Sequence, residues 1–433
     1  MNRFASLSNL FLPILILAAA PLEKLSWKIG FTLRPVMIFS LIAFFLWLIK
    51  SLATGFAVSR EVRRLMTVFC LMTMTFLLAS INSLEPLISM RHTILYFTLF
   101  LLAFLMIDFI KNINRLALFV KVWMSVGVGM CIYGLLQFMG PFYGFDVDKV
   151  FFGLLYSQPE PFSLERAINP GIRAYSLFGD ANNYAGYLTT VLPFFICSLL
   201  YYNKTGSWRQ KILFWFLTTF VLVSLILTLS RSGGLGLLAI SLVLLILKRR
   251  TLLSLAGLKF WLAGGLVVFL LVWQLGAIII PLIEKRLTET SSAKIHLFVA
   301  ESAIKLFLMN PLTGVGLGNF GPAYGKYFNP GYEYYNPHST FLSILADTGL
   351  IGFVVYMTFY GYVLKQILKF RRQALGYHKE VIGDGLLAGF LGLMAANIFY
   401  QNFTYQFFWV FLALGFAAGT LVRESGSTMF KYV

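Results

Sequence analysis

The chain has 433 residues, of which 59% are hydrophobic and only 12% are charged. Together with a mean hydropathy of +0.79, this composition excludes a water-soluble domain with a single core and indicates an integral membrane protein. The net charge of +18 does not indicate nucleic-acid binding, because the basic residues are scattered over short segments between apolar runs and do not gather on one face.

The lengths of the apolar runs predict an all-α, polytopic membrane bundle, because a helix of about 20 apolar residues crosses the ~30 Å hydrocarbon core of a bilayer. We expect about twelve transmembrane helices. In chain order they cover residues 5–22, 35–52, 65–81, 93–110, 116–139, 182–202, 212–230, 233–248, 256–282, 339–363, 382–400 and 404–422.

The distribution of charge predicts the orientation of this bundle. Every second connection, together with both termini, holds 22 of the 35 basic residues but only five of the 17 acidic residues. Basic residues in short loops remain preferentially on the cytoplasmic side. We therefore expect both termini to be cytoplasmic.

Two connections are longer than the rest, residues 140–181 and 284–338, and both lie on the predicted outer side. Long loops often carry function, so we expect these two to be partly helical and to form a working outer face. The alternative is a pair of caps packed over the bundle. No separate soluble domain is evident, which predicts a single transmembrane domain over residues 1–433.

An acidic pair, Asp146 and Asp148, occurs in the first long loop. Many nucleotide-sugar transferases hold a divalent metal with such a pair. Because nucleotide sugars are found on the other side of the membrane, we expect a solvated loop with Lys149 nearby and no metal. Since Cys70, Cys131 and Cys197 all fall in apolar runs, no disulfide or zinc site is indicated either.

Arg173 lies just before the sixth expected helix, whose start Asp180 or Asn182 would cap. An arginine beside a helix N-terminus forms an anion site, because the helix dipole and the forked guanidinium donors act together. The alternative is a local salt bridge with Glu165.

Arg231 lies in the tight connection between the seventh and eighth expected helices, followed by Ser232, Gly233 and Gly234. A guanidinium so close to hydrocarbon is costly unless it is paired or reaches the interface. We interpret Arg231 as a fixed cation that faces an anionic ligand. An interfacial anchor is the alternative.

The segment Pro311–Gly321 is rich in glycine but lacks the strand that precedes a dinucleotide-binding loop. We expect a bent outer loop that approaches lipid phosphates closely. Arg286 and Lys294, on the stretch that leads to it, are further candidates for binding pyrophosphate.

His338, at the entrance of the tenth expected helix, is one of only four histidines. A neutral imidazole can accept a proton near neutral pH, as a general base must. Asp347 is no orienting partner, because nine residues at about 100° each place it on the opposite face of the same helix. The alternative is a helix-start histidine that is hydrogen-bonded to a loop.

Tyrosines crowd the segment before His338, where they would stack on sugar rings or form an interfacial aromatic belt. They are Tyr324, Tyr327, Tyr332, Tyr334 and Tyr335. We take Tyr334 and Tyr335, together with Asn182, as candidate substrate contacts.

The stretch from Arg173 to Leu350 resembles the O-antigen ligase and polymerase family, membrane glycosyltransferases that use undecaprenyl-pyrophosphate-linked glycans. The resemblance rests on residues 173–183, Ser230-Arg231, residues 311–318, and His338 followed by residues 347–352. Many members have Asn-Pro-Asn where this chain has Asp180-Ala181-Asn182, and often an arginine near the position of Lys294.

The resemblance implies a metal-independent, inverting transfer that needs no cofactor. Paired arginines would hold the pyrophosphate, and a histidine would take the proton of the acceptor hydroxyl. Arg173 and Arg231 match the arginine positions, and His338 matches the histidine.

The expected protein is therefore a ligase of the bacterial inner membrane that moves a glycan from undecaprenyl pyrophosphate to a lipid A-core hydroxyl at the periplasmic face. Its partners would be the lipid-linked donor, a lipid A-core or glycan acceptor, and membrane lipids. A repeat-unit polymerase of the same family is one alternative, because it uses the same donor. A transporter or flippase for lipid-linked saccharides is another, although the helix interiors hold almost no ionisable residues.

Overall fold

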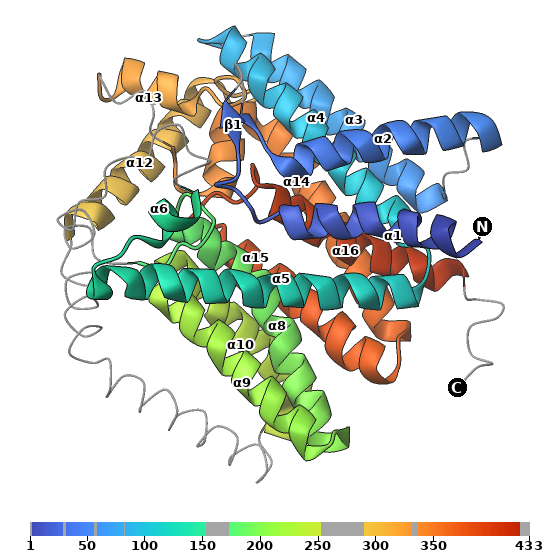
Figure 1. Cartoon of the computed structure of the whole chain (residues 1–433). Coiled ribbons are helices and arrows are strands. Elements are labelled where there is room, and N and C mark those ends of the chain that lie inside the picture. Colours follow the sequence, from blue (N-terminus) through green and yellow to red (C-terminus); the bar gives the residue numbers. More distant parts are fainter. Residues whose placement is uncertain are drawn as a thin grey trace.

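A computed structural model describes residues 2–28, 32–55, 59–81, 83–152, 173–252, 290–330 and 336–424, and these residues form a helical bundle (Figure 1). Its helices are α1 (Asn2–Ala19), α2 (Pro35–Thr54), α3 (Arg60–Ile81), α4 (Pro86–Phe109), α5 (Ile113–Met139), α6 (Val147–Phe152), α8 (Ala181–Thr205), α9 (Trp208–Leu227), α10 (Arg231–Leu252), α12 (Thr290–Met309), α13 (Phe320–Tyr327), α14 (Thr340–Gln373), α15 (Asp384–Ala396) and α16 (Gln406–Glu424). Two short strands, β1 (Trp27–Lys28) and β2 (Thr32–Leu33), pair antiparallel. A 3₁₀ turn covers Gly140–Tyr143, and a π-helical turn covers His378–Gly383.

The predicted polytopic helical fold is confirmed. Eleven of the twelve expected spans coincide with helices, and the span expected at 256–282 lies outside the described residues. Within the described part of the chain, seven helices are long and apolar enough to cross a membrane, namely α2, α3, α4, α5, α8, α9 and α14. The helices α6, α12 and α13 lie within the two long connections, which are thus partly helical as predicted.

The outer surface of α2 and α3 carries large apolar side chains that are exposed in the structure. Leu52 is 69% exposed, Ile49 64% and Leu77 56%. In water such a surface would promote aggregation, whereas in a bilayer it faces lipid tails.

The centre of the bundle is α8, which packs against α9, α10 and α15. Of its most apolar 18-residue segment, 89% is buried inside the protein. A second part of the core joins α16 to α4 and α14, where the fully buried Trp409 indole meets the Phe100 ring with centroids 5.1 Å apart. Such aromatic contacts hold helices together in a setting where burial away from water contributes little.

Local sequence signals set where the helices around the site begin and bend. Asp180 caps α8, because its carboxylate accepts a hydrogen bond from the N–H of Asn182, and Ser339 caps α14 in the same way through the N–H of Leu342. These side chains satisfy amide groups that the first helical turn leaves unpaired. Gly349, with a φ of +63°, marks a kink inside α14 that other residues would adopt only under strain.

The chain alternates between two ends of the bundle. One end holds the starts of α8, α10 and α14 together with α6, α12 and α13, and lies at the left of Figure 1; we call it the site end. The other, where α1 begins and α16 ends, is the basic end. There the buried Asp384 carboxylate pairs with Lys248 at 2.7 Å and with Arg371 at 2.5 Å, which ties α10, α14 and α15 together.

Candidate functional site

Arg173 is fixed at the site end by two hydrogen bonds. Its Nε donates to the carbonyl oxygen of Thr228 at 2.7 Å, and its Nη2 donates to Oδ1 of Asn182 at 3.0 Å. The same Oδ1 accepts a hydrogen bond from the Ser230 hydroxyl at 2.7 Å. The guanidinium thus links the start of α8 to the turn between α9 and α10, and the salt bridge considered with Glu165 lies outside the described residues.

That turn brings Arg231 close to Arg173. It consists of only Thr228, Leu229 and Ser230, and Leu229 has a φ of +48°. The Ser230 hydroxyl accepts a hydrogen bond from the N–H of Gly233 at 3.2 Å, which stabilises the first turn of α10. Arg231 opens this helix and is exposed. A guanidinium next to the free amide groups of a helix start is suited to bind an anion.

Gly233 allows α10 to begin against α8. A Cβ atom at this position would lie 2.7 Å from the Cβ of Ala185. Gly233 therefore serves the packing of α10 against α8.

Asp180 and Tyr400 extend the site on the other side of Asn182. Asp180 caps α8 as predicted, and the Tyr400 side chain lies near the side chains of Asp180 and Asn182. Burial and the Asp180 charge raise the pKa of Tyr400 above its usual value, so this hydroxyl keeps its proton. Tyr400 lies between α15 and α16, and nothing in the sequence pattern singled it out.

His338 adopts a backbone conformation that is uncommon for a residue with a side chain. Its φ is +50°, and its N–H donates to Oδ1 of Asn336 at 2.9 Å. The ring atom Nδ1 is buried and has no hydrogen-bond partner among the described residues. Strained backbone and an unsatisfied buried nitrogen together are costly, and such costs often occur at sites of function.

His296 on α12 is a second histidine that the sequence reasoning missed. Its ring centroid lies 4.3 Å from that of His338, with the planes at 68°. Burial and the neighbouring His296 lower the pKa of His338 to about 4, although Asp180 acts in the opposite direction. Burial and then the positive charge of Arg231 lower the pKa of His296 too. At neutral pH both imidazoles are therefore uncharged.

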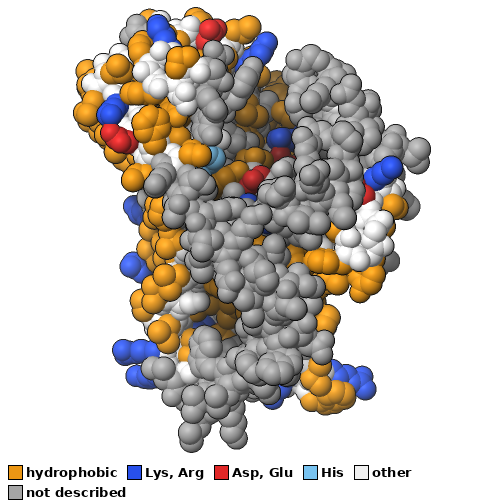
Figure 2. Space-filling view, turned by 90° about the vertical axis from the view of Figure 1, so that its left-hand side faces the viewer, with side chains coloured by type: hydrophobic (Ala, Val, Ile, Leu, Met, Phe, Trp, Pro, Cys, Tyr) orange, Lys and Arg blue, Asp and Glu red, His pale blue; other side chains and the backbone are white. Residues whose placement is uncertain are grey.

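The site residues thus gather at one end, where they come from α8, the α9–α10 turn, α12, the start of α14 and the segment before α16. Figure 2 looks onto this face and shows acidic, basic and histidine side chains close together among hydrophobic ones. The structure brings together Arg173, Asn182, Arg231 and His338, four of the residues selected from the sequence.

The structure does not describe all of the remaining predicted site residues. Arg286, Tyr334 and Tyr335 lie outside the described residues, and of Lys294 only the backbone, on α12, is described. Tyr324 is 2% exposed and packs against Phe320 and Phe328, so it belongs to a hydrophobic cluster and is not a sugar platform. Tyr327, at 46%, remains open to solvent.

The acidic pair of the first long connection is not a solvated loop, contrary to the prediction. The Asp148 carboxylate pairs with Lys24 and accepts hydrogen bonds from Tyr133 and Gln137. Asp146 accepts hydrogen bonds from the N–H groups of Asp148 and Lys149 and so begins α6. The α5 donors to Asp148 hold α6 against α5, whereas the donors to Asp146 belong to α6 itself.

The expectation that the glycine-rich segment approaches lipid phosphates is also wrong. Gly314 to Leu317 are buried, and the Asp347 carboxylate accepts hydrogen bonds from the N–H groups of Gly318 and Phe320, both at 2.9 Å. A Cβ atom on Gly314 would lie 2.4 Å from the backbone of Asp347. Gly314 lets this segment pack onto α14, and Asp347 holds it there, which confirms that Asp347 is not the partner of His338.

Part of this site lies in a segment that is similar to known proteins. Residues 212–357, which include Arg231, His296 and His338, match the family model described as O-antigen ligase. The chain is also 29% identical over 132 residues to the teichuronic acid biosynthesis protein TuaE of Bacillus subtilis strain 168. That match covers 29% of this chain and only 26% of the relative. Residues 212–357 are thus similar to the O-antigen ligase family.

Proposed function

We propose that this chain is a membrane glycosyltransferase that moves a glycan from undecaprenyl pyrophosphate to a hydroxyl group of lipid A-core. The observation that carries this proposal is the meeting of Arg173, Arg231 and His338 at one end of an apolar bundle. A polyprenyl carrier stays among lipid tails while its pyrophosphate and sugar project into water, so the donor needs cations directly above an apolar surface.

Arg173 and Arg231 bind the pyrophosphate of the donor. When the bond between the anomeric carbon and the phosphate oxygen breaks, negative charge develops on the departing undecaprenyl pyrophosphate. Fixed guanidinium groups stabilise that charge through charge-assisted hydrogen bonds. Because the hydrogen bond to Thr228 already holds Arg173 in place, little reorganisation is needed during the reaction.

His338 accepts the proton of the acceptor hydroxyl as its oxygen attacks the anomeric carbon. One displacement forms one carbon–oxygen bond and breaks another, and it inverts the configuration at that carbon. A pKa of about 4 keeps the imidazole of the free protein neutral and ready to accept a proton. The bound pyrophosphate, an anion beside it, raises that pKa and so strengthens the base when the substrate is present.

The basic end of the bundle supports the proposed compartment. The predicted cytoplasmic residues Lys248, Arg371 and Arg372 lie at this end, away from His338. The positive-inside rule then places the site at the periplasmic face of the bacterial inner membrane and both termini in the cytoplasm. Electrostatic stabilisation by arginines requires no metal, and the Asp148 carboxylate is already bonded to protein groups.

A repeat-unit polymerase is the second candidate, because the same donor chemistry serves a growing glycan as acceptor. The name of the relative refers to teichuronic acid biosynthesis, which favours glycan assembly of this kind. A flippase is disfavoured, because a transporter has no use for a neutral, strained histidine beside two arginines.

In vitro transfer from a synthetic undecaprenyl-pyrophosphate glycan to purified lipid A-core tests the proposal. We expect the wild type to transfer glycan with inversion, with or without a chelator, and His338→Ala to lose about 10² to 10⁴ in rate. His378→Ala, a histidine of the basic end, is the matched control and should retain activity. Growth of the donor glycan alone would identify a polymerase, and transport without transfer would refute the proposal.

A further inference from the structure

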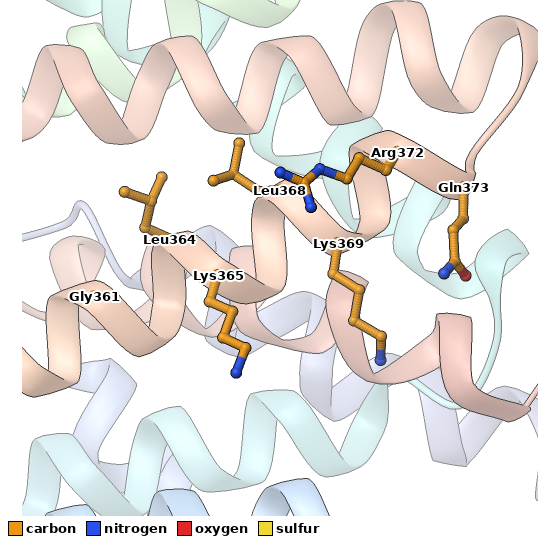
Figure 3. A pocket seen from close by; sticks show the side chains of 7 residues that line it. All are labelled: Gly361, Leu364, Lys365, Leu368, Lys369, Arg372 and Gln373. Carbon is orange, nitrogen blue, oxygen red and sulfur yellow. The ribbon is translucent and has the colours of Figure 1, made fainter.

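A groove runs along the last four turns of α14 at the basic end, far from His338. It encloses about 400 Å³ and is lined by Gly361, Leu364, Lys365, Leu368, Lys369 and Arg372, among others. These residues recur at intervals of three and four, so they share one side of the helix. Figure 3 shows that Lys365 and Lys369 extend in the same direction, whereas Arg372 lies close to Leu368.

The length of α14 places this groove at the membrane surface. The helix has 34 residues and starts at the site end, and about 20 residues span the hydrocarbon core. Residues beyond Gly361 therefore extend into the headgroup region. The ion pairs of Asp384 with Arg371 and Lys248 put the last turns of α10 at the same level, where the exposed Arg249 and Arg250 follow.

Aromatic side chains mark the same level independently. Tyr202 and Tyr377 lie with ring centroids 6.4 Å apart, and the neighbouring Trp208 is 67% exposed. Tyrosine and tryptophan collect where lipid headgroups meet hydrocarbon.

The groove combines positive charge at its outer end with an apolar floor. Among the described residues, its lining contains three basic side chains and no carboxylate. Lys369 donates a hydrogen bond to the carbonyl oxygen of Gly419 at 3.0 Å, which fixes its ammonium group. The nearby Glu61 of α3 is 7% exposed and is held by the Tyr362 hydroxyl at 2.6 Å and by Arg64 at 3.6 Å, so it does not neutralise the groove.

We propose that this groove binds an anionic phospholipid. The headgroup phosphate lies between Lys365 and Arg372, and an acyl chain runs past Leu368 and Leu364 to Gly361, where the lack of a side chain leaves room. A zwitterionic lipid also carries a positive charge in its headgroup. The same three basic residues repel that charge, so binding of a zwitterionic lipid is disfavoured. The site is distinct from that of the proposed transfer reaction, since it occupies the opposite end of the bundle.

The test measures binding of fluorescent phosphatidylglycerol and phosphatidylcholine to the full-length protein in neutral detergent. We expect the wild type to prefer phosphatidylglycerol, and Lys365→Gln/Arg372→Gln to bind it roughly tenfold or more weakly, because each cation near an anionic lipid contributes roughly fivefold. Each single variant should show part of this loss. Arg249→Gln/Arg250→Gln removes the same charge at the same end but outside the groove, and should keep the preference.

Two results would overturn the proposal. An equal loss in both double variants would mean that net charge, and not the groove, attracts the lipid. Retained preference in Lys365→Gln/Arg372→Gln would mean that the lipid binds elsewhere. The thermal midpoint of each variant without added lipid shows whether it folds, and because Lys365 and Arg372 are exposed we expect it to match the wild type.

Discussion

The imidazole rings of His296 and His338 lie edge to face with centroids 4.3 Å apart. Two imidazolium ions so close together would repel each other strongly, so the pair resists protonation. Arg231 adds to this effect by lowering the pKa of His296. The arrangement keeps His338 neutral over a wide pH range, although an isolated histidine would be half charged near pH ~6.5.

Replacement of His296 by phenylalanine should therefore change the pH profile of transfer. Phenylalanine keeps a ring against His338 but removes the titrating neighbour that lowers its pKa. The pKa of His338 should rise from about 4 toward its ordinary value, so the acid limb of kcat/KM moves to higher pH, because protonated His338 cannot act as a base. Rates measured from pH 4 to 8 test for this shift. If the acid limb of kcat/KM stays at the same pH, the charge of His296 does not affect the pKa of His338.

The forked geometry of Arg173 should matter beyond its charge. Arg173→Lys keeps the positive charge but cannot bond Thr228 and Asn182 while also facing a ligand. We expect kcat to fall on the order of tenfold to a hundredfold, and a similar loss for Arg231→Lys. Arg115→Lys is the control, since Arg115 also donates to a backbone carbonyl, that of Phe109, but lies at the basic end. An unchanged kcat in Arg173→Lys would mean that Arg173 contributes only its positive charge and not its hydrogen-bonding geometry.

The sequence predicted the bundle well, because the rules for crossing a bilayer act locally along the chain. Each span that apolar length predicted within the described residues coincides with a helix. The helix cap at Asp180 was also predicted from the sequence, because the capping preference depends on residues a few positions apart.

The rest of the site depends on contacts between distant segments, which no local pattern reveals. His296 and Tyr400 meet His338 only because α12 and the segment before α16 pack beside the start of α14. Asp148 seemed solvated because its partner Lys24 is far away in the chain. The same limit explains why the glycines at 314–318 suggested a phosphate loop. In the structure Gly314 fits against α14, Gly316 against Ser83 and Gly318 against His92 of α4.

Gly314 and Gly376 offer a direct test of that packing. Both have positive φ, +72° and +52°, so alanine strains the backbone at either position by about 1–2 kcal/mol. At Gly314 the added Cβ also meets backbone atoms of Asp347 at 2.4 Å, whereas nothing lies within 4 Å at Gly376. Gly314→Ala should therefore lower the thermal midpoint more than Gly376→Ala. Equal decreases in the thermal midpoint would show that the chain at Gly314 does not pack tightly against α14.

Tyr400 should position the catalytic groups without taking part in proton transfer, because burial and the charge of the neighbouring Asp180 raise its pKa. Tyr400→Phe removes the hydroxyl near Asp180 and Asn182 but keeps the ring beside His338, with centroids 6.1 Å apart in the wild type. Asn182 would then hold Arg173 less firmly. We expect kcat to fall about three- to tenfold, as for the loss of one hydrogen bond of about 1 kcal/mol, with KM and the pH profile unchanged.

Asp180→Asn keeps a good helix cap but removes the charge that raises the pKa of His338. The acid limb of this variant should therefore move to lower pH. If Tyr400→Phe moved the acid limb as well, the hydroxyl would be part of the titrating group, and its role would be catalytic.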